Sequence, residues 1–279
     1  MQVKMASDIE SDSLHLRVPP AGSPNAHSRR SATNEGIATF TANGLAVANN
    51  LLAALPRKEC RQLIDDMQPV ALTCGDVLHE PEEQMEYVYF PNDCVVALLT
   101  LAHQHQALGI GLVGREGMVG ISLALGIGTS PLRALVQSSG TAMRMKAAAF
   151  LKELRQNHAL QRELHRYAYA LMVQITQTAA CNHYYFVEAR LARWLLMTDD
   201  RMQSGPFRLS QEFLAKMLGV RRVGVNKAAR SLQKNKLISY SRSNITILDR
   251  KGLEAYKEKR SQHWCDNSPD QCVSLIEEV

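Results

Sequence analysis

The chain has 279 residues, of which 46% are hydrophobic and 21% are charged, and its formal net charge is +5. This composition is typical of a globular protein with about two domains and argues against a disordered or fibrous chain. No apolar run reaches the ~18 residues of a membrane-spanning helix, and the first residues, MQVKMASDIESDS, lack the apolar core of a signal peptide. We therefore expect a cytoplasmic protein that does not bind a membrane.

Residues 1–45 are rich in Ser, Pro, Asn and Ala and have little apolar periodicity, so we predict a disordered N-terminal arm. A short helical segment is expected within residues 49–68. After it, the sequence changes to short β-prone runs broken by Gly, Pro and Asn, such as EYVYFPNDCVVALLTL and ALGIGLVG. Strands of this length at near-regular spacing predict an antiparallel roll or barrel, which we assign to a domain spanning residues 46–155.

His103 and His105 form a H-x-H pair in this β-rich region. On a strand such a pair places both imidazoles on one face, as metal-binding barrel enzymes of the cupin type require. Those enzymes also need a Glu about four residues later, whereas the first acidic residue here is Glu116. We therefore predict no metal site. A cupin-like small-molecule or metal-binding barrel with a basic, nucleic-acid-binding tail remains the alternative.

Residues 156–186 are predicted to form one long helix. Apolar and small polar residues recur there at spacings of four and three, which is the pattern of a heptad seam that packs on a partner helix. The positions are Leu164, Ala168, Leu171, Ile175, Thr178, Asn182 and Tyr185. We favour a two-fold dimer through this helix, and the alternative is a helix that packs on its own β-roll. A second helix, at about 187–202, is expected to pack beneath the segment that follows.

Residues 209–248 are predicted to form a helix, a tight turn, a second helix and a β-hairpin. Ser210 is a good N-cap for the first helix, and Gly219 can adopt the left-handed conformation that ends it. The second helix is expected from about residue 221 to 235. Its inward face is predicted to consist of Val225, Ala228, Ala229 and Leu232.

The outward face of the second helix is polar and basic. Arg222, Asn226 and Arg230 are spaced i, i+4, i+8, so they share one exposed strip. Arg can bind guanine and Asn can bind adenine through two hydrogen bonds each, which favours base recognition. Residues 188–260 contain 17 Lys and Arg against 7 Asp and Glu, a net charge of +10, so the rest of the chain carries −5. This asymmetry indicates a polyanionic partner.

We therefore predict sequence-specific binding to double-stranded DNA. The predicted DNA-contacting residues are Ser210, Gln211, Arg221, Arg222, Asn226, Lys227, Arg230, Arg242 and Ser243.

The run LSQEFLAKMLGVRR, followed by a helix and LISYSRSNITILDRKGLE, resembles the C-terminal winged helix-turn-helix of Crp/Fnr-type bacterial transcription regulators. The similarity covers about residues 49–260. It implies an α+β chain with an N-terminal antiparallel, jelly-roll-like β-roll of the cyclic-nucleotide-binding type. A central dimerisation helix at 156–186, a winged helix-turn-helix at 187–260 and a tail at 261–279 complete the expected order.

The resemblance also implies a homodimer that reads an inverted repeat, with the second helix in the major groove and RNA polymerase as a partner. One departure from the family pattern is Val223. The best-known members carry Glu directly after the important DNA-contacting Arg, which corresponds to Arg222 here. The iron–sulfur members carry a tight N-terminal cysteine cluster, whereas the first cysteine here is Cys60.

Residues 117–136 correspond to the family's nucleotide pocket. The Gly-rich turn is present at Gly117 and Gly120, but Ile121 stands where nucleotide-binding members carry Glu. The family's Arg-Ser/Thr-Ala appears here as Leu132, Arg133 and Ala134, with the Arg displaced by one position. On a strand, one step turns a side chain to the opposite face. We therefore expect Arg133 to face away from the pocket and the effector, if any, to differ from a conventionally bound cyclic nucleotide.

Enzymatic function is not predicted, because the sequence contains no nucleophile elbow, P-loop or His-Glu-x-x-His motif. The cysteines lack the paired spacing of a disulfide framework or zinc site, so we expect reduced thiols and no cofactor. They are Cys60, Cys74, Cys94, Cys181, Cys265 and Cys272.

Overall fold

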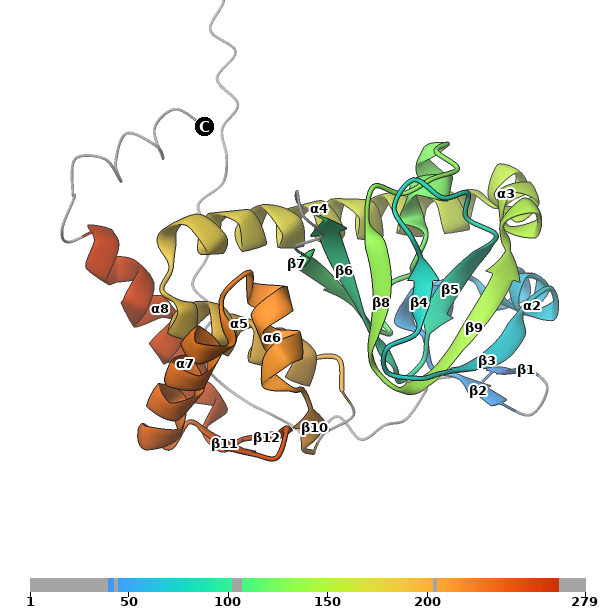
Figure 1. The fold of residues 1–279 in the computed structure, drawn as a ribbon. Coiled ribbons are helices and arrows are strands. Elements are labelled where there is room, and N and C mark those ends of the chain that lie inside the picture. The colour runs from blue at the N-terminus through green and yellow to red at the C-terminus, as the bar shows by residue number, and fades with distance from the viewer. Residues whose placement is uncertain (1–39, 43–44, 102–106, 203–204, 266–279) are drawn as a thin grey trace, which may run out of the picture. The chain divides into compact units, whose positions relative to one another are not determined.

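The computed structural model describes residues 40–42, 45–101, 107–202 and 205–265, which fall within a unit spanning Ala38–Val279 (Figure 1). Side chains are described for those between 48 and 257. His103, His105, most of the predicted arm, and the side chains of Cys265 and Cys272 therefore lie outside the described residues. Within the described ranges, no helix is both long and apolar enough to cross a membrane.

Two antiparallel sheets form the predicted roll (Figure 1), with strand orders β3-β9-β5 and β4-β8-β6-β7. The first sheet comprises β3 (Gln68–Leu72), β5 (Tyr87–Pro91) and β9 (Gly140–Lys146). The second comprises β4 (Val77–His79), β6 (Val95–Leu101), β7 (Ala107–Val113) and β8 (Arg133–Ser138). The segments before the roll are β1 (Phe40–Ala42), β2 (Leu45–Val47), α1 (Asn50–Ala53) and α2 (Arg57–Asp65), and the 3₁₀ helix η2 (Ile121–Leu125) lies between β7 and β8.

Large apolar side chains on one face of the first sheet pack against the helix that follows β9. Phe90, Met143, Met145 and Phe150 are each at most 1% exposed. Phe150 comes from α3 (Ala147–Gln156), and its ring lies 6.5 Å from that of Phe90. This face of the first sheet is therefore part of a packed hydrophobic core.

Strand β8 has two faces with different neighbours. Ala134 and Val136 belong to the core between the sheets, whereas Leu135 and Gln137 contact the helices that follow the roll. This alternation is the period-two rule of an extended strand. The second sheet is consequently covered on both sides.

Helix α4 (His158–Tyr184) matches the predicted central helix, and Asn157 caps its start by accepting a hydrogen bond from Leu160 N–H at 2.8 Å. Part of the stripe predicted as a heptad seam packs on the chain's own roll, which was the alternative considered for this helix. Leu164 and Leu171 are buried in the core of the chain's own roll, and Thr178 is 6% exposed. A 3–4 spacing marks any helix that covers an apolar surface, so it does not distinguish a partner helix from a sheet.

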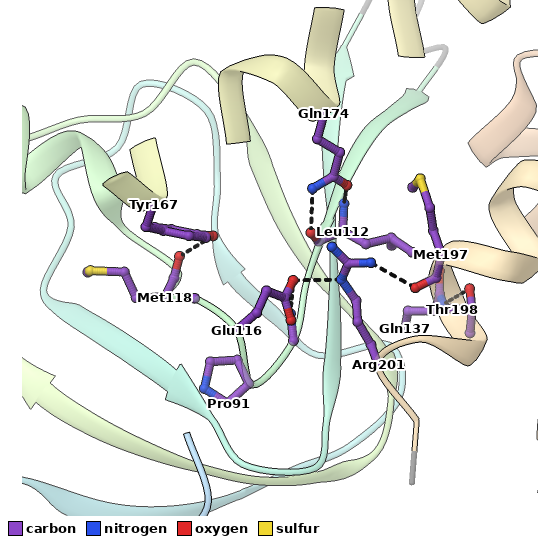
Figure 2. A network of polar contacts seen from close by, with 12 residues as sticks. Pro91, Leu112, Glu116, Met118, Gln137, Tyr167, Gln174, Met197, Thr198 and Arg201 are labelled. Carbon is purple, nitrogen blue, oxygen red and sulfur yellow. Dashed lines mark hydrogen bonds and ion pairs between the residues drawn. The ribbon is translucent and has the colours of Figure 1, made fainter. Parts of the chain in front are cut away.

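Gln174 of α4 hydrogen-bonds to the open side of β7, an edge strand of its sheet, at Leu112 (Figure 2). Its Oε1 accepts from Leu112 N–H at 2.7 Å, and its Nε2 donates to Leu112 C=O at 3.1 Å. An unpaired edge strand is exposed to pairing with other chains. The helix therefore supplies at Leu112 the partner that a further strand would have supplied.

The C-terminal elements form a winged helix-turn-helix, with a small sheet of order β10-β12-β11. They are α5 (Val187–Asp199), β10 (Phe207–Arg208), α6 (Gln211–Leu218), α7 (Arg222–Lys234), β11 (Ile238–Ser241), β12 (Asn244–Ile247) and α8 (Arg250–Cys265). Helix α5 packs beneath α6 and α7, as predicted. Helix α8 continues past residue 260, where the sequence prediction placed the end of the domain. The predicted α+β fold is confirmed.

Helix α5 is fixed to the roll by buried polar contacts as well as apolar ones. The Gln137 amide donates to Thr198 Oγ1 at 3.0 Å and accepts from Trp194 Nε1 at 3.1 Å. Arg201 pairs with Glu116 at 2.7 Å (Figure 2). Gly109 of β7 leaves room for the Trp194 ring, because an added Cβ would lie 2.6 Å from it.

Candidate nucleic-acid interface

The two helices of the helix-turn-helix begin and end where their capping residues predict. Ser210 Oγ accepts a hydrogen bond from Phe213 N–H at 3.1 Å, and Gly219 ends α6 with a φ of 59°. Arg221 is the extended N-cap residue of α7, and Asn235 is its C-cap. The turn between the helices therefore fixes the direction of α7 through local chemistry.

Helix α7 has the predicted division into two faces. Val225, Ala228, Ala229 and Leu232 are each at most 2% exposed and belong to the core beneath the helix. Arg221, Arg222, Lys227 and Arg230 are exposed, and Asn226 is half-buried. The basic face is thus available to an external partner.

One groove, with a volume of about 540 Å³, lies between the start of α6, the face of α7 and the β11–β12 hairpin. Most of the residues predicted to contact DNA line it, namely Ser210, Gln211, Arg222, Asn226, Arg230, Arg242 and Ser243. Arg221 and Lys227 are exposed on α7 outside this lining. The fold brings together in one groove residues that are up to 33 positions apart in the sequence.

Four lining residues escaped the sequence prediction: Glu212, Ala229, Gln233 and Tyr240. Gln233 follows Arg222, Asn226 and Arg230 on the same side of α7, so the helical period could have indicated it. No local pattern pointed to Tyr240, whose hydroxyl donates to Leu209 C=O at 2.8 Å and ties the wing to the start of α6. Burial raises the pKa of Tyr240, and the nearby Arg222 partly opposes this shift.

Gln211 lies beside both candidate base-reading residues of α7. Its Oε1 is 3.4 Å from Arg222 Nε and 3.4 Å from Asn226 Nδ2. These distances exceed the usual 2.7–3.2 Å of an N–H···O bond, so the contacts are weak. The groups can therefore exchange them for shorter hydrogen bonds to a ligand at little cost.

The tip of the wing is a two-residue turn. Ser241 pairs with Asn244, and the two residues between them, Arg242 and Ser243, have φ values of 48° and 71°. Two consecutive positive φ angles define a type I′ turn, which normally carries Asn or Gly. The chain therefore holds an arginine at the wing tip in a backbone conformation that costs it free energy.

The exposed cations of this surface have no anionic partners among the described residues. Arg221, Arg222, Lys227, Arg230 and Arg242 take part in none of the ion pairs found there. Arg250 of α8, by contrast, pairs with Asp199, Asp200 and Glu254. Unpaired cations around an open groove suit a polyanion, which would supply the missing countercharge.

The described residues predicted to form an effector pocket are in contact with other parts of the roll and with α4. Gly117 lies under the Tyr167 ring of α4, and its carbonyl accepts from Asn49 Nδ2 at 2.9 Å. Gly120, with a φ of 98°, provides the left-handed start of η2, and its position lies against Val88. Ile121 and Leu132 pack against the core of the roll.

Arg133 and Ala134 of β8 point in opposite directions. Ala134 is 2% exposed in the roll core. Arg133 Nε donates to Glu80 Oε2 at 2.8 Å, and its side chain is 34% exposed. By strand alternation the guanidinium shares the face of Leu135 and Gln137, away from the core.

A metal-binding arrangement is not evident in the part of the chain that the structure describes, where no group of three or more His, Cys, Asp or Glu is placed to hold an ion. Cys60, Cys94 and Cys181 are buried, and burial raises the pKa of the Cys60 thiol to about 11 and that of Cys94 to about 12. Neither thiol is therefore activated as a nucleophile or ligand.

Comparison with known proteins agrees with this geometry. Residues 189–256 match the family model of the Crp-like helix-turn-helix domain. No curated protein matches the chain. The chain thus carries a helix-turn-helix domain of the Crp type, and the groove lies within it.

Solved structures share the wider fold. FixK2 from Bradyrhizobium japonicum aligns at 16% identity and a TM-score of 0.59, over 68% of this chain and 96% of its own. A CRP/FNR-family transcriptional regulator from Thermus thermophilus aligns at 19% identity and a TM-score of 0.55, over 69% and 100%. The c-di-GMP-responsive global regulator CLP from Xanthomonas campestris aligns at 17% and 0.53, over 69% and 99%. These likenesses concern the fold, and with the helix-turn-helix match they confirm the resemblance to Crp/Fnr-type transcription regulators.

Proposed function

We propose that this regulator of the Crp/Fnr type binds an inverted-repeat operator in duplex DNA as a homodimer, with α7 in the major groove. The observation that carries the proposal is the groove in which Arg222, Asn226 and Arg230 meet the start of α6 and the wing. A recognition helix contacts base edges through its N-terminal residues, and a two-fold dimer presents two such helices ~34 Å apart. The resemblance implies RNA polymerase as the protein partner on which a DNA-bound regulator would act.

Within this proposal the cations have two roles. Arg222, beside Gln211 and Asn226 at the start of α7, would read a guanine edge. Lys227, outside the groove lining, would contact a phosphate. Ser210 and Gln211 at the N-terminus of α6, and Arg242 and Ser243 at the wing tip, would also contact phosphates.

Selection of bound duplexes from a random pool, followed by sequencing, tests the operator directly. An inverted repeat with half-sites one helical turn apart is expected. On that operator Arg222→Ala should lose about 1–3 kcal/mol and relax the preference at one base pair per half-site. Lys227→Ala should weaken all sequences alike and reduce the slope of log affinity against log salt. Two variants indistinguishable from the wild type would refute this choice of face.

For the dimer we propose the exposed face of α4, since the first predicted seam is buried. Tyr169, Met172 and Val173 are 65%, 56% and 37% exposed, and Thr176 continues the same face at a spacing of four from Met172. Apolar side chains this exposed on one helix face gain stability when a second copy covers them.

The mass in solution tests the dimer. The wild type should run at about twice the 31.0 kDa of one chain, and Met172→Glu should shift it toward the single-chain mass. Leu248→Glu is the matched control, because Leu248 is 59% exposed but lies after β12. A Met172→Glu protein that keeps the mass of the wild type would exclude this face.

We further propose that the roll does not bind cyclic AMP through an arginine–phosphate contact. Support comes from Arg133, which pairs with Glu80, and from Ile121 in place of an acidic residue. Calorimetry with cyclic AMP, cyclic GMP and c-di-GMP, the ligand class named for the Xanthomonas neighbour, should detect no micromolar binding of the first two. Micromolar cyclic AMP binding that Arg133→Ala abolishes would contradict the proposal.

A further inference from the structure

Val223 is an exposed apolar side chain on the basic face of α7. It is 65% exposed and lies in the first turn of the helix, next to Arg221 and Arg222. Lys227 and Arg230 follow it at i+4 and i+7, so the three side chains share the outward line of the helix. An apolar group is thus surrounded by unpaired cations on the surface proposed to face DNA.

Folding does not account for a valine at this position. Val223 is absent from the core beneath α7, which is formed by Val225, Ala228, Ala229 and Leu232. A β-branched residue also lowers helix propensity relative to alanine. The side chain therefore contributes nothing to the stability of the isolated chain that alanine would not provide.

The chemistry of the major groove limits what this side chain can recognise. Base edges there present hydrogen-bond donors and acceptors, and thymine alone adds a C5-methyl group. A valine that faced a polar edge would desolvate it without replacing its hydrogen bonds. A valine that faced a methyl group would remove both apolar surfaces from water.

We propose that Val223 is a specificity-determining residue that selects thymine by contact with its C5-methyl group. The proposal rests on the DNA-binding function proposed above and specifies one base of the half-site. The neighbouring cations support it, because they hold the duplex against this part of α7 and so bring Val223 to the base edges. Arg222 would read the adjacent base pair.

Replacement of thymine by deoxyuridine removes only the methyl group and is the direct test. The operator selected with the full-length protein is made with deoxyuridine at one thymine position at a time. At one position per half-site the wild type should bind about fourfold more weakly, and about 15-fold when both half-sites are changed, as expected for one buried methyl group each. At other thymines the affinity should not change.

Variants of the protein assign the effect to Val223. Val223→Ala should bind the thymine operator as weakly as the wild type binds the deoxyuridine operator, and should no longer distinguish the two. Val223→Ile should keep the distinction. Lys227→Ala, the matched control on the same line of α7, should bind both operators more weakly but preserve the ratio between them.

The outcomes separate this inference from the function on which it rests. If the wild type selects an inverted repeat but no deoxyuridine substitution matters, or if Val223→Ala remains as sensitive as the wild type, the methyl contact is refuted and DNA recognition stands. If the protein selects no duplex sequence, the proposed function itself fails. Far-UV circular dichroism of Val223→Ala that matches the wild type assigns its lost discrimination to the contact and not to the fold.

Discussion

The helix-turn-helix groove and the hydrophobic core of the roll differ in whether their side chains are paired or packed within the chain itself. The groove is lined by Arg222, Asn226, Arg230 and Arg242, and its cations have no anionic partner among the described residues. The hydrophobic core of the roll is filled by the chain itself, with Phe90, Met143 and Met145 buried in it and Phe90 packed against Phe150 of α3. The cations of the groove are therefore open to solvent or to an external ligand, whereas the apolar side chains of the roll core are covered by the chain itself.

This difference implies that substitutions in the two regions change different quantities. An exposed, unpaired cation adds little to the free energy of unfolding, but each contact with a phosphate releases counterions and adds affinity. A fully buried side chain adds to the stability of the fold and reaches no ligand. The predictions below test that separation.

Phe90→Ala should cause the largest loss of stability. The ring is fully buried and lies against Phe150 of α3, so its removal leaves a cavity in a close-packed core. We expect the free energy of unfolding to fall by about 3–5 kcal/mol. Urea denaturation followed by circular dichroism measures it.

The control for Phe90→Ala is Arg222→Ala, for which a change within about 0.5 kcal/mol is expected at an exposed site. The affinity for operator DNA should show the opposite. Arg222→Ala should lose affinity, and Phe90→Ala should keep it once its fraction of folded protein is taken into account. A large loss of stability in Arg222→Ala would contradict the idea that groove residues affect DNA binding and core residues affect stability.

Acid should weaken the fold through His79. This side chain is 8% exposed, its Nε2 has no hydrogen-bond partner among the described residues, and burial lowers its pKa from 6.5 to about 4. Below pH 6.5 the His79 imidazole is protonated in the unfolded chain but stays neutral in the folded chain. The free energy of unfolding should therefore fall between pH 6.5 and 4 and level off below pH 4. The loss due to this group should be roughly 3 kcal/mol.

Urea denaturation at a series of pH values measures this loss. His79→Leu should flatten that part of the profile. The His79 contribution is refuted if the slope between pH 6.5 and 4 is the same in His79→Leu as in the wild type.

Gln137 joins β8 of the roll to α5, the helix beneath the groove, so Gln137→Leu tests whether the roll and the DNA-binding domain act independently. The substitution leaves the Trp194 indole N–H buried without its acceptor, and Thr198 keeps only its bond to Trp194 C=O at 2.9 Å. A buried donor without a partner costs about 1–3 kcal/mol. Thermal denaturation should show this loss, and Gln177→Ala, at an exposed position, should not.

The effect of Gln137→Leu on DNA binding then sharpens the comparison. If the contact serves stability alone, the affinity for the operator per folded molecule should match that of the wild type. A changed affinity for operator DNA with unchanged salt dependence would mean that the position of α5 on the roll determines the orientation of α7.

How much the sequence predicted depends on whether a feature is local. Ser210, Gly219 and the four inward residues of α7 act within one or two helical turns, so the sequence located the helices almost to the residue. Seven of the residues that line the groove were also named, because a helix period and one hairpin determine their positions.

The role of Leu164 and Leu171 did not follow from the sequence. Their spacing is the same whether α4 covers a sheet or a partner helix, and only the tertiary fold decides between the two. Gln174, Gln137 and Tyr240 were missed for a related reason. Each acts on a backbone or side chain 31 to 62 positions away, and no local pattern signals such a partner.

The wing tip gives the smallest effect, and there the two quantities should move in opposite directions. Arg242 was predicted as a phosphate contact, but its positive φ could not be read from the sequence. Asn tolerates the left-handed region better than Arg, so Arg242→Asn should raise the free energy of unfolding by about 0.5–1 kcal/mol. It should also lower the affinity for the operator, with the salt slope reduced by about one for each protomer.

Arg242→Lys is the matched control, because it keeps both the charge and the strained backbone. It should therefore leave stability and the salt slope close to those of the wild type. If Arg242→Asn instead lowers stability, the arginine side chain contributes to folding. The wing tip would then act like the hydrophobic core of the roll, which stabilises the fold, and not like the groove.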